Sequence, residues 1–296
     1  MSGLLSRATV VAVGLTCKAA LNLGFCSVNV NGLHILDHAL AHARRNNRQG
    51  VVTVSNHIST LDDPVTWGVL PARYYLNSRT TRWALGASDV MFTNPIFSTF
   101  FRHGQTLETF RGKGVHQSAV DTAIQKLDQG DWVHLYGEGK INQPETYVQD
   151  ENGVAHLPRF KWGVGRILME TLVPPVIIPM WLTGFDKLMP EGRRFPYKYL
   201  PRPGAQLSVT FGNPLSTGEI QEARRSIKNG PPLTDPCSPA NAQKLTGWIK
   251  DQISQDLHPP SIGEQDLLKI RAAVTAIVQR GVESLGRSVC GDKLRL

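Results

Sequence analysis

The stretch GVVTVSNHISTLDDP, at residues 50–64, decides the fold of this chain. Val51–Ser55 is a short β-branched run bounded by a glycine and an asparagine, which is typical of a buried strand. Pro64 suits the first turn of a helix, with Asp62 or Asp63 as its N-cap. A strand that passes directly into a helix predicts an α/β protein, and such strand-to-helix turns expose functional groups.

His57 and Asp62 lie on this turn, where their side chains can meet. An imidazole bonded to a carboxylate is held in one tautomer, and its other nitrogen can take a proton from a hydroxyl. The sequence therefore predicts a general base. The alternative from these residues alone is that His57 merely ends the strand and Asp62 merely caps the helix.

A basic loop follows further along, FRGKG at residues 110–114, before an amphipathic helix predicted over Gly114–Gly130. Arg111 and Lys113 therefore lie near the positive end of a helix dipole, a position that suits a phosphate group. The alternative is a solvated arginine and lysine between glycines.

Three more apolar runs predict strands. Trp132–Tyr136 reads as a second buried strand, so Glu138 falls on another strand-end turn, where Gly139 allows close backbone approach. Pro175–Leu182 and Ala205–Phe211 read as the third and fourth strands. Their nearly continuous apolar character predicts a central, mostly parallel sheet flanked by helices on both faces.

The N-terminal segment, residues 1–30, predicts a membrane-anchoring or targeting element. Ala8–Phe25 would form a helix about 27 Å long, which is shorter than a bilayer core of about 30 Å. Lys18 and Asn22 also interrupt its apolar character. We therefore expect a monotopic helix that lies in one leaflet. A membrane span and a secretory signal are the alternatives.

The remaining chain divides at a proline-rich stretch. We expect the catalytic domain over residues 31–228 and a linker with a helical appendage over residues 229–296. The linker is predicted at 229–241, because proline and glycine recur there. Helices are predicted at 242–257 and at 264–285, the second with an amphipathic docking face.

Composition narrows the partners. The 296 residues carry 32 basic and 24 acidic side chains, a formal net charge of +8, which indicates nucleic acid or an anionic membrane surface. A charged fraction of 19% with 41% hydrophobic residues excludes global disorder. No apolar run is long enough for a multi-span membrane protein. No RNA-binding or helix-turn-helix pattern is present, so we expect no nucleic acid.

Metal binding is not expected either. The four cysteines lie far apart without any C-x-x-C pair, so neither a disulfide scaffold nor a structural zinc site is predicted. His34, His38 and His42 recur every four residues, and this spacing favours a polar helix face over a metal site.

Taken in order, SNHISTLDDP from Ser55, FRGKG from Phe110, YGEGK from Tyr136 and PVIIP from Pro175 resemble the four blocks of the glycerolipid acyltransferase family. The resemblance covers roughly residues 25–215. It is sharpest to the branch that moves acyl chains between phospholipids and lysophospholipids, through GEGKIN, RFKWGVGR and IIPMWLTGFDKLMP. Gly137 departs from the family, which usually has proline there, and Lys140-Ile141-Asn142 replaces its usual Thr/Ser-Arg.

The resemblance implies the family's α/β fold and its acyltransferase chemistry. His57 would be the general base and Asp62 would orient it, while Arg111 with Lys113 would hold phosphate. Glu138 with Gly139 would fix the glycerol or headgroup. The implied reaction is a CoA-independent transacylation in cardiolipin remodelling, with no cofactor. The implied location is a mitochondrial membrane, inner or outer, facing the intermembrane space.

Two other functions stay open. An acyl-CoA-dependent lysophospholipid or glycerophosphate acyltransferase would use the same histidine and aspartate. A protein of another class, which binds anionic membranes without catalysis, would need neither residue.

Overall fold

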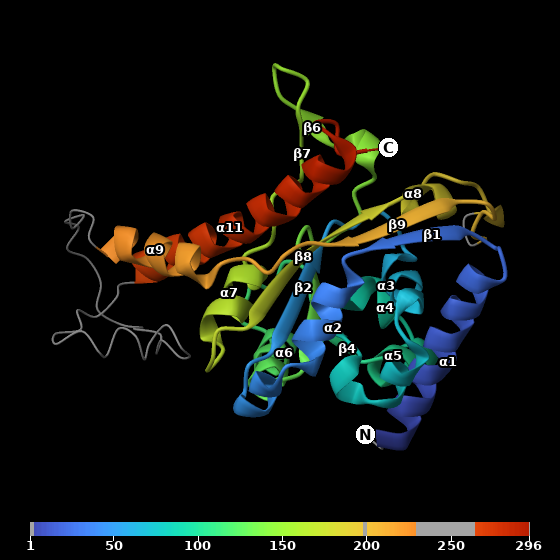
Figure 1. The fold of residues 1–296 in the computed structure, drawn as a ribbon, viewed down its shortest axis with the longest axis horizontal. Coiled ribbons are helices and arrows are strands. Elements are labelled where there is room, and N and C mark those ends of the chain that lie inside the picture. The colour runs from blue at the N-terminus through green and yellow to red at the C-terminus, as the bar shows by residue number, and fades with distance from the viewer. Residues whose placement is uncertain (1–2, 198–199, 229–263, 296) are drawn as a thin grey trace.

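A seven-stranded sheet forms the centre of the molecule (Figure 1). The computed structural model describes residues 3–197, 200–228 and 264–295. The strand order is β1-β9-β8-β2-β5-β3-β4, and all neighbours are parallel except the antiparallel pair β8 and β9. The strands are β1 (Ser27–Asn31), β2 (Val51–Ser55), β3 (Trp83–Ala87), β4 (Thr106–Thr109), β5 (Trp132–Tyr136), β8 (Val176–Thr183) and β9 (Gln206–Phe211).

The decisive stretch occupies the centre of this sheet. All residues of β2 are buried, and the strand pairs with β8 on one side and β5 on the other. A strand enclosed on both sides and both faces has no solvated side, which explains why its sequence shows no polar alternation. The predicted central, mostly parallel sheet is confirmed.

Helices cover the sheet, and α6, α7 and α11 pack together as one group. At the other end of the sheet, α1 contacts the edge strand β1 and α2 contacts its neighbour β9. The helices are α1 (Gly3–Asn22), α2 (Leu33–Ala41), α3 (Asp62–Thr66), α4 (Ser88–Met91), α5 (Pro95–His103), α6 (Ser118–Asp128), α7 (Gly163–Glu170), α8 (Phe185–Leu188), α9 (Thr217–Lys228) and α11 (Glu264–Cys290).

Short elements complete the chain. A two-stranded antiparallel hairpin, β6 (Val148–Gln149) with β7 (Ala155–His156), projects beside the end of α11 (Figure 1). Five 3-10 turns connect larger elements in the described residues: η1 (Ala43–Asn47), η2 (Trp67–Val69), η3 (Ala72–Leu76), η4 (Ser78–Thr80) and η5 (Pro144–Thr146).

Helix α1 lies along the domain, beside α5 (Figure 1). It is the one helix in the described part of the chain that is long and apolar enough to cross a membrane. Lys18, one of two charged residues in this helix beside Arg7, donates from Nζ to the carbonyl oxygen of Leu70 at 2.9 Å. Gly14 lies so close to the ring of Tyr75 that a Cβ would stand 2.9 Å from it. One side of α1 is therefore docked on protein.

The C-terminal helix covers the sheet, where α11 contacts β8, β2 and α7. Ile270, Val274 and Val278 are buried against the core. The helix predicted at 264–285 is thus present and continues to Cys290. The predicted linker at 229–241 and the predicted helix at 242–257 lie outside the described residues.

Helix α7 is shorter than the pattern of its sequence suggests. The small and apolar residues at 157–172 favour a helix throughout, but α7 begins only at Gly163. The amide N–H groups of Phe160 and Lys161 donate to Gln279 Oε1 and to the carbonyl oxygen of Gly137, at 3.0 and 2.8 Å. Tertiary hydrogen bonds therefore replace the first helical turns.

Candidate active site

His57 and Asp62 meet on the turn between β2 and α3. The distance from His57 Nδ1 to Asp62 Oδ2 is 2.8 Å, and the imidazole is 20% exposed whereas Asp62 is fully buried. An ionised carboxylate only accepts hydrogen bonds, so Nδ1 carries the proton and Nε2 presents a lone pair. The sequence prediction that the turn unites these two residues is confirmed in geometry.

Asp62 is fixed by the main chain as well as by the imidazole. Its Oδ2 also accepts from the amides of Ile58 and Ser59, at 2.6 and 2.9 Å. Burial raises the pKa of Asp62, whereas the hydrogen bonds from His57 and these amides lower it. The carboxylate therefore closes its own turn, and it does not cap α3, which has no side-chain cap.

Glu138 and Asn142 hold the main chain of His57 from both sides. The amide of His57 donates to Glu138 Oε1 at 3.0 Å, and the carbonyl oxygen of His57 accepts from the amide of Asn142 at 2.8 Å. Asn142 Nδ2 also donates to Glu138 Oε2. Burial raises the pKa of Glu138 to about 8, although these hydrogen bonds oppose the rise. Glu138 is 1% exposed.

The turn around Glu138 needs its glycines. Gly139 has a φ of 68°, in the left-handed region that favours glycine. A Cβ on Gly137 would overlap the ring of Phe160, which is buried against this turn. The glycine that stands where the wider family usually has proline is thus matched by the aromatic ring that fills the space above it.

Arg111 and Lys113 lie in an exposed loop after β4. Arg111 Nη1 pairs with Asp89 Oδ2 at 3.1 Å, and Lys113 Nζ lies 5.6 Å from the ring centroid of Phe110. Both partners of the ion pair are more than half exposed, so the pair contributes little to stability. No described contact joins either cation to His57, Asp62 or Glu138.

These groups nevertheless share one edge of the sheet. His57 follows β2, Glu138 follows β5 and Arg111 follows β4, and these parallel strands end on the same side. Three strand spacings separate β2 from β4, which is about 14 Å. Chemistry and anion binding can therefore act on different parts of one extended substrate.

Comparison with known proteins agrees with this geometry. The sequence model described as Acyltransferase matches residues 28–183, which contain His57, Asp62, Arg111 and Glu138. The chain belongs to the acyltransferase family. It is therefore an enzyme, as its sequence predicted.

Two curated relatives resemble this acyltransferase over most of its length. An N-acylphosphatidylethanolamine synthase of Arabidopsis thaliana is 32% identical and covers 86% of this chain and 87% of its own. A tafazzin of Dictyostelium discoideum is 30% identical and covers 88% of each chain. The predicted resemblance to this branch of the family is thus confirmed by sequence similarity to a tafazzin.

A solved structure supports the fold. The 1-acyl-sn-glycerophosphate acyltransferase of Thermotoga maritima matches with a TM-score of 0.50 and 18% identity, over 93% of this chain and 79% of its own. At that identity the match concerns the architecture alone. The predicted acyltransferase-like α/β fold is confirmed.

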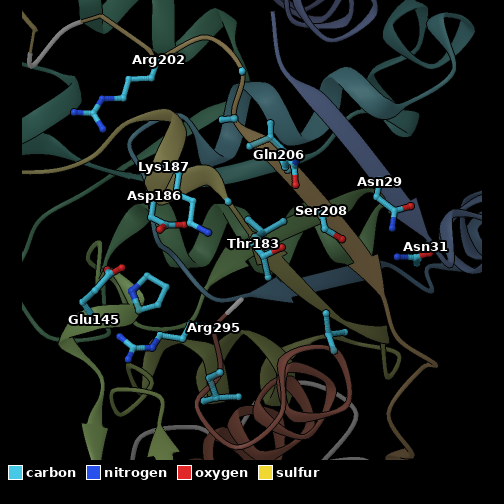
Figure 2. A pocket seen from close by; sticks show the side chains of 18 of the residues that line it. Asn29, Asn31, Glu145, Thr183, Asp186, Lys187, Arg202, Gln206, Ser208 and Arg295 are labelled. Carbon is cyan, nitrogen blue, oxygen red and sulfur yellow. The ribbon is translucent and has the colours of Figure 1, made fainter. Parts of the chain in front are cut away.

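A separate cleft of 670 Å³ lies where β1, β9 and β8 meet the end of α11 (Figure 2). Asn29, Ser208 and Thr183 project from the strands, while Lys187 and Arg295 lie at its border (Figure 2). None of the predicted site residues lines it. Its lining mixes these polar side chains with apolar ones, among them Leu182, Leu207 and Val289.

Three residues around His57 were not singled out from the sequence of this acyltransferase. Asn56 exchanges two hydrogen bonds with the main chain of Leu182, at 3.0 and 2.9 Å, and so fixes the end of β2 to β8. Asn142 holds the His57 carbonyl. Tyr136 stacks on the His57 ring. Their signal in the sequence was position alone, because each lies inside one of the motifs SNHISTLDDP, YGEGK and GEGKIN. The described residues contain no cluster that could hold a metal ion.

Proposed function

We propose that this acyltransferase moves a fatty acyl chain between a phospholipid and a lysophospholipid without coenzyme A. The observation that carries the proposal is the hydrogen bond between His57 and the buried Asp62, which leaves Nε2 free to accept a proton. The similarity to a tafazzin over 88% of both chains supports phospholipids as the substrate class.

In the proposed reaction His57 Nε2 takes the proton of the lysophospholipid hydroxyl as its oxygen attacks the ester carbonyl of the donor. The tetrahedral intermediate then expels the oxygen of the new lysophospholipid, which receives the proton back from His57. One ester bond forms and one breaks, so the exchange is nearly isoenergetic and balances without another reactant. Asp62 stabilises the imidazolium between these steps.

The remaining site residues serve binding and position. We propose that Arg111, with Lys113, exchanges Asp89 for a substrate phosphate, so Arg111→Ala raises KM more than it lowers kcat. Glu138 acts on the glycerol site indirectly, by holding the main chain of His57. Its two carboxylate oxygens accept from the His57 amide and from Asn142 Nδ2. Gly139 supplies the left-handed turn that brings Asn142 back to His57.

The enzyme works at a membrane, which it contacts through the surface of α1 and α5. The exposed apolar side chains of both helices support this: Leu4, Leu5 and Leu15 on α1, and Ile96, Phe97 and Phe100 on α5. Because α1 is docked along α5, the two helices lie side by side in one part of the molecule (Figure 1). This arrangement supports a monotopic insertion into one leaflet. The net charge of +8 suits an anionic membrane.

The physiological substrate we propose is cardiolipin with its lyso form, in a mitochondrial membrane facing the intermembrane space. This step rests on the resemblance to the transacylases. Mass spectrometry of cardiolipin acyl chains in mitochondria lacking the enzyme tests it, and an unchanged chain composition would contradict it.

A purified-protein assay tests the main proposal. Labelled phosphatidylcholine and an unlabelled lysophospholipid are incubated with the enzyme in the strict absence of coenzyme A. Label is expected to appear in the acceptor and to be lost in the His57→Ala variant. Transfer that begins only when acyl-CoA is added would instead establish the acyl-CoA-dependent activity.

A second candidate function follows from the relative in Arabidopsis thaliana, whose name specifies N-acylation. In that reaction the acceptor is the amine of phosphatidylethanolamine, and the product is an amide. The same assay with phosphatidylethanolamine separates the two, because an amide product survives mild alkali and an ester product does not.

A further inference from the structure

His57 is held at Nδ1 and at its main chain, but these contacts leave the plane of its ring undetermined. A single hydrogen bond to Asp62 allows the imidazole to tilt about the line that joins Nδ1 to the carboxylate. A tilted ring would turn Nε2 away from the acceptor hydroxyl, and misplacement of a catalytic group by about 1 Å costs about a hundredfold in rate. A contact on the flat face of the ring would remove this freedom.

Tyr136, the last residue of β5, provides that contact. Its ring centroid lies 4.2 Å from that of His57, with 25° between the planes, which is a stacked arrangement. The hydroxyl of Tyr136 is buried and has no hydrogen-bond partner among the described residues. The ring therefore accounts for the position of this residue, and the hydroxyl does not.

Tyr136 in turn packs against His134, which lies two residues earlier on the same face of β5. The two rings meet edge to face, with centroids 4.5 Å apart and planes at 85°. His134 is 1% exposed, and burial lowers its pKa to about 3, so it remains neutral at physiological pH. An uncharged ring can pack here without a counter-charge.

The orientation of His134 is fixed by a series of hydrogen bonds in which each group donates to the next. The hydroxyl of Ser55 donates to the carbonyl oxygen of Asn56 at 2.9 Å, so it accepts from His134 Nε2, 3.4 Å away. His134 Nδ1 then accepts from the hydroxyl of Thr53 at 2.8 Å, and Thr53 accepts from Trp132 Nε1 at 2.9 Å. The series ends at the residue before His57.

We propose that Tyr136 is a positioning residue of the acyl-transfer reaction, whose ring supports one face of the His57 imidazole and keeps Nε2 directed at the acceptor hydroxyl. The inference rests on the proposed function, because it assigns His57 as the base. It adds a residue outside the His57, Asp62, Arg111 and Glu138 set, and it gives β5 a second role beside carrying Glu138.

Three variants separate the ring from the hydroxyl. Tyr136→Phe keeps the stack and is expected to retain kcat within about twofold. Tyr136→Leu and the more flexible Tyr136→Met remove the ring, and kcat is expected to fall about three- to tenfold, the range of one aromatic contact. KM is expected to change less than about twofold, because Tyr136 touches the base and not the binding loop. Thermal unfolding of each variant shows whether the fold survives.

A spectroscopic measurement tests the stack independently of activity. In full-length protein labelled at histidine Cε1, the His57 proton is identified by its loss in His57→Gln. The ring current of Tyr136 is expected to shift this proton upfield in wild type and in Tyr136→Phe, and the shift is expected to vanish in Tyr136→Leu and Tyr136→Met. This readout applies even if the wild-type protein fails to transfer acyl groups, a failure that would contradict the proposed function alone.

Each outcome decides the proposal. The proposal is supported if the folded leucine and methionine variants lose the ring-current shift and also show the expected fall in kcat. A phenylalanine variant as slow as the leucine variant would show that the hydroxyl acts and would overturn it. Normal kcat without the ring, or no upfield shift in wild type, would overturn it as well.

Discussion

At the residue scale, Asp62 combines two functions in one carboxylate oxygen. Oδ2 receives the main-chain amides of Ile58 and Ser59 as well as His57 Nδ1. Its neighbour Asp63 instead pairs with Arg82 and accepts from Trp67 Nε1 at 3.0 Å. The two adjacent aspartates thus face different partners, and only one of them reaches the base.

The first prediction concerns this pair. His57→Ala and Asp62→Asn are each expected to lower turnover at least about a hundredfold, the usual loss with a general base or its orientation. Asparagine at 62 can still accept the two amide hydrogen bonds, so the fold is expected to persist. Turnover is measured with labelled phospholipid, and His34→Ala, which changes an exposed histidine, serves as the control. Near-normal turnover in both folded variants would refute the mechanism.

The second prediction concerns Glu138 and pH. Burial raises its pKa from 4.5 to about 8, so between these values the folded protein binds more protons than the unfolded chain. The free energy of unfolding therefore decreases as pH rises through this window. Glu138→Gln removes the titrating group, and the decrease is expected to become smaller.

Urea unfolding between pH 6.5 and 8.5 measures this difference. His134, whose pKa is lowered from 6.5 to about 3, adds a linkage of opposite sign at the acidic end of this range, but it contributes equally to wild type and Glu138→Gln and cancels in the comparison. Glu145→Gln, which changes an exposed carboxylate, should leave the wild-type slope unchanged. Identical slopes for wild type and Glu138→Gln would show that Glu138 is ionised throughout.

At the element scale, two glycines of α7 appear equivalent in sequence but differ in structure. A Cβ on Gly165 would collide with the carbonyl oxygen of Arg271 and would lie 2.6 Å from Thr275 Oγ1, both on α11. A Cβ on Gly163 would meet nothing within 4 Å. Gly165 therefore serves the close packing of α7 against α11.

The third prediction uses this matched pair. Gly165→Ala is expected to destabilise the fold by about 1–3 kcal/mol, because α7 and α11 must separate to admit the methyl group. Gly163→Ala is expected to be neutral or to stabilise by up to about 1 kcal/mol, through helix propensity. Urea denaturation followed by circular dichroism measures both. Equal stabilities would indicate that α11 does not pack this closely in solution.

At the scale of the whole molecule, we expect both the excess positive charge and the apolar surface of α1 and α5 to contribute to membrane binding. The fourth prediction is that Phe97→Ser combined with Phe100→Ser weakens binding to anionic vesicles at least about tenfold, since each removes an apolar ring from the bilayer. Val148→Ser, which also changes an exposed apolar residue but on the β6–β7 hairpin, is the control and should bind normally.

The same vesicle experiment separates charge from apolar contact. Raising the salt concentration is expected to weaken binding to anionic vesicles, because screening acts on exposed charges. Turnover in detergent micelles should change much less, since His57 and Asp62 form a short, partly buried pair. Flotation assays measure binding, and equal losses for all variants would place the membrane surface elsewhere.

The sequence by itself determined four of the seven strands, β2, β5, β8 and β9, and the pairing of His57 with Asp62, whereas it did not indicate β1, β3 and β4. These features are local or repetitive, because buried parallel strands are apolar throughout and a five-residue turn brings its own ends together. The four motifs, in their order along the chain, are sufficient to indicate the acyltransferase family.

Only the tertiary structure decided how the catalytic imidazole is held. Tyr136, Glu138 and Asn142 lie about eighty residues from His57 in sequence, and they reach it because β5 pairs with β2 in parallel register. The start of α7 was likewise decided by hydrogen bonds to Gln279 and Gly137. Such contacts depend on which strands become neighbours, and no local pattern in the chain encodes that choice.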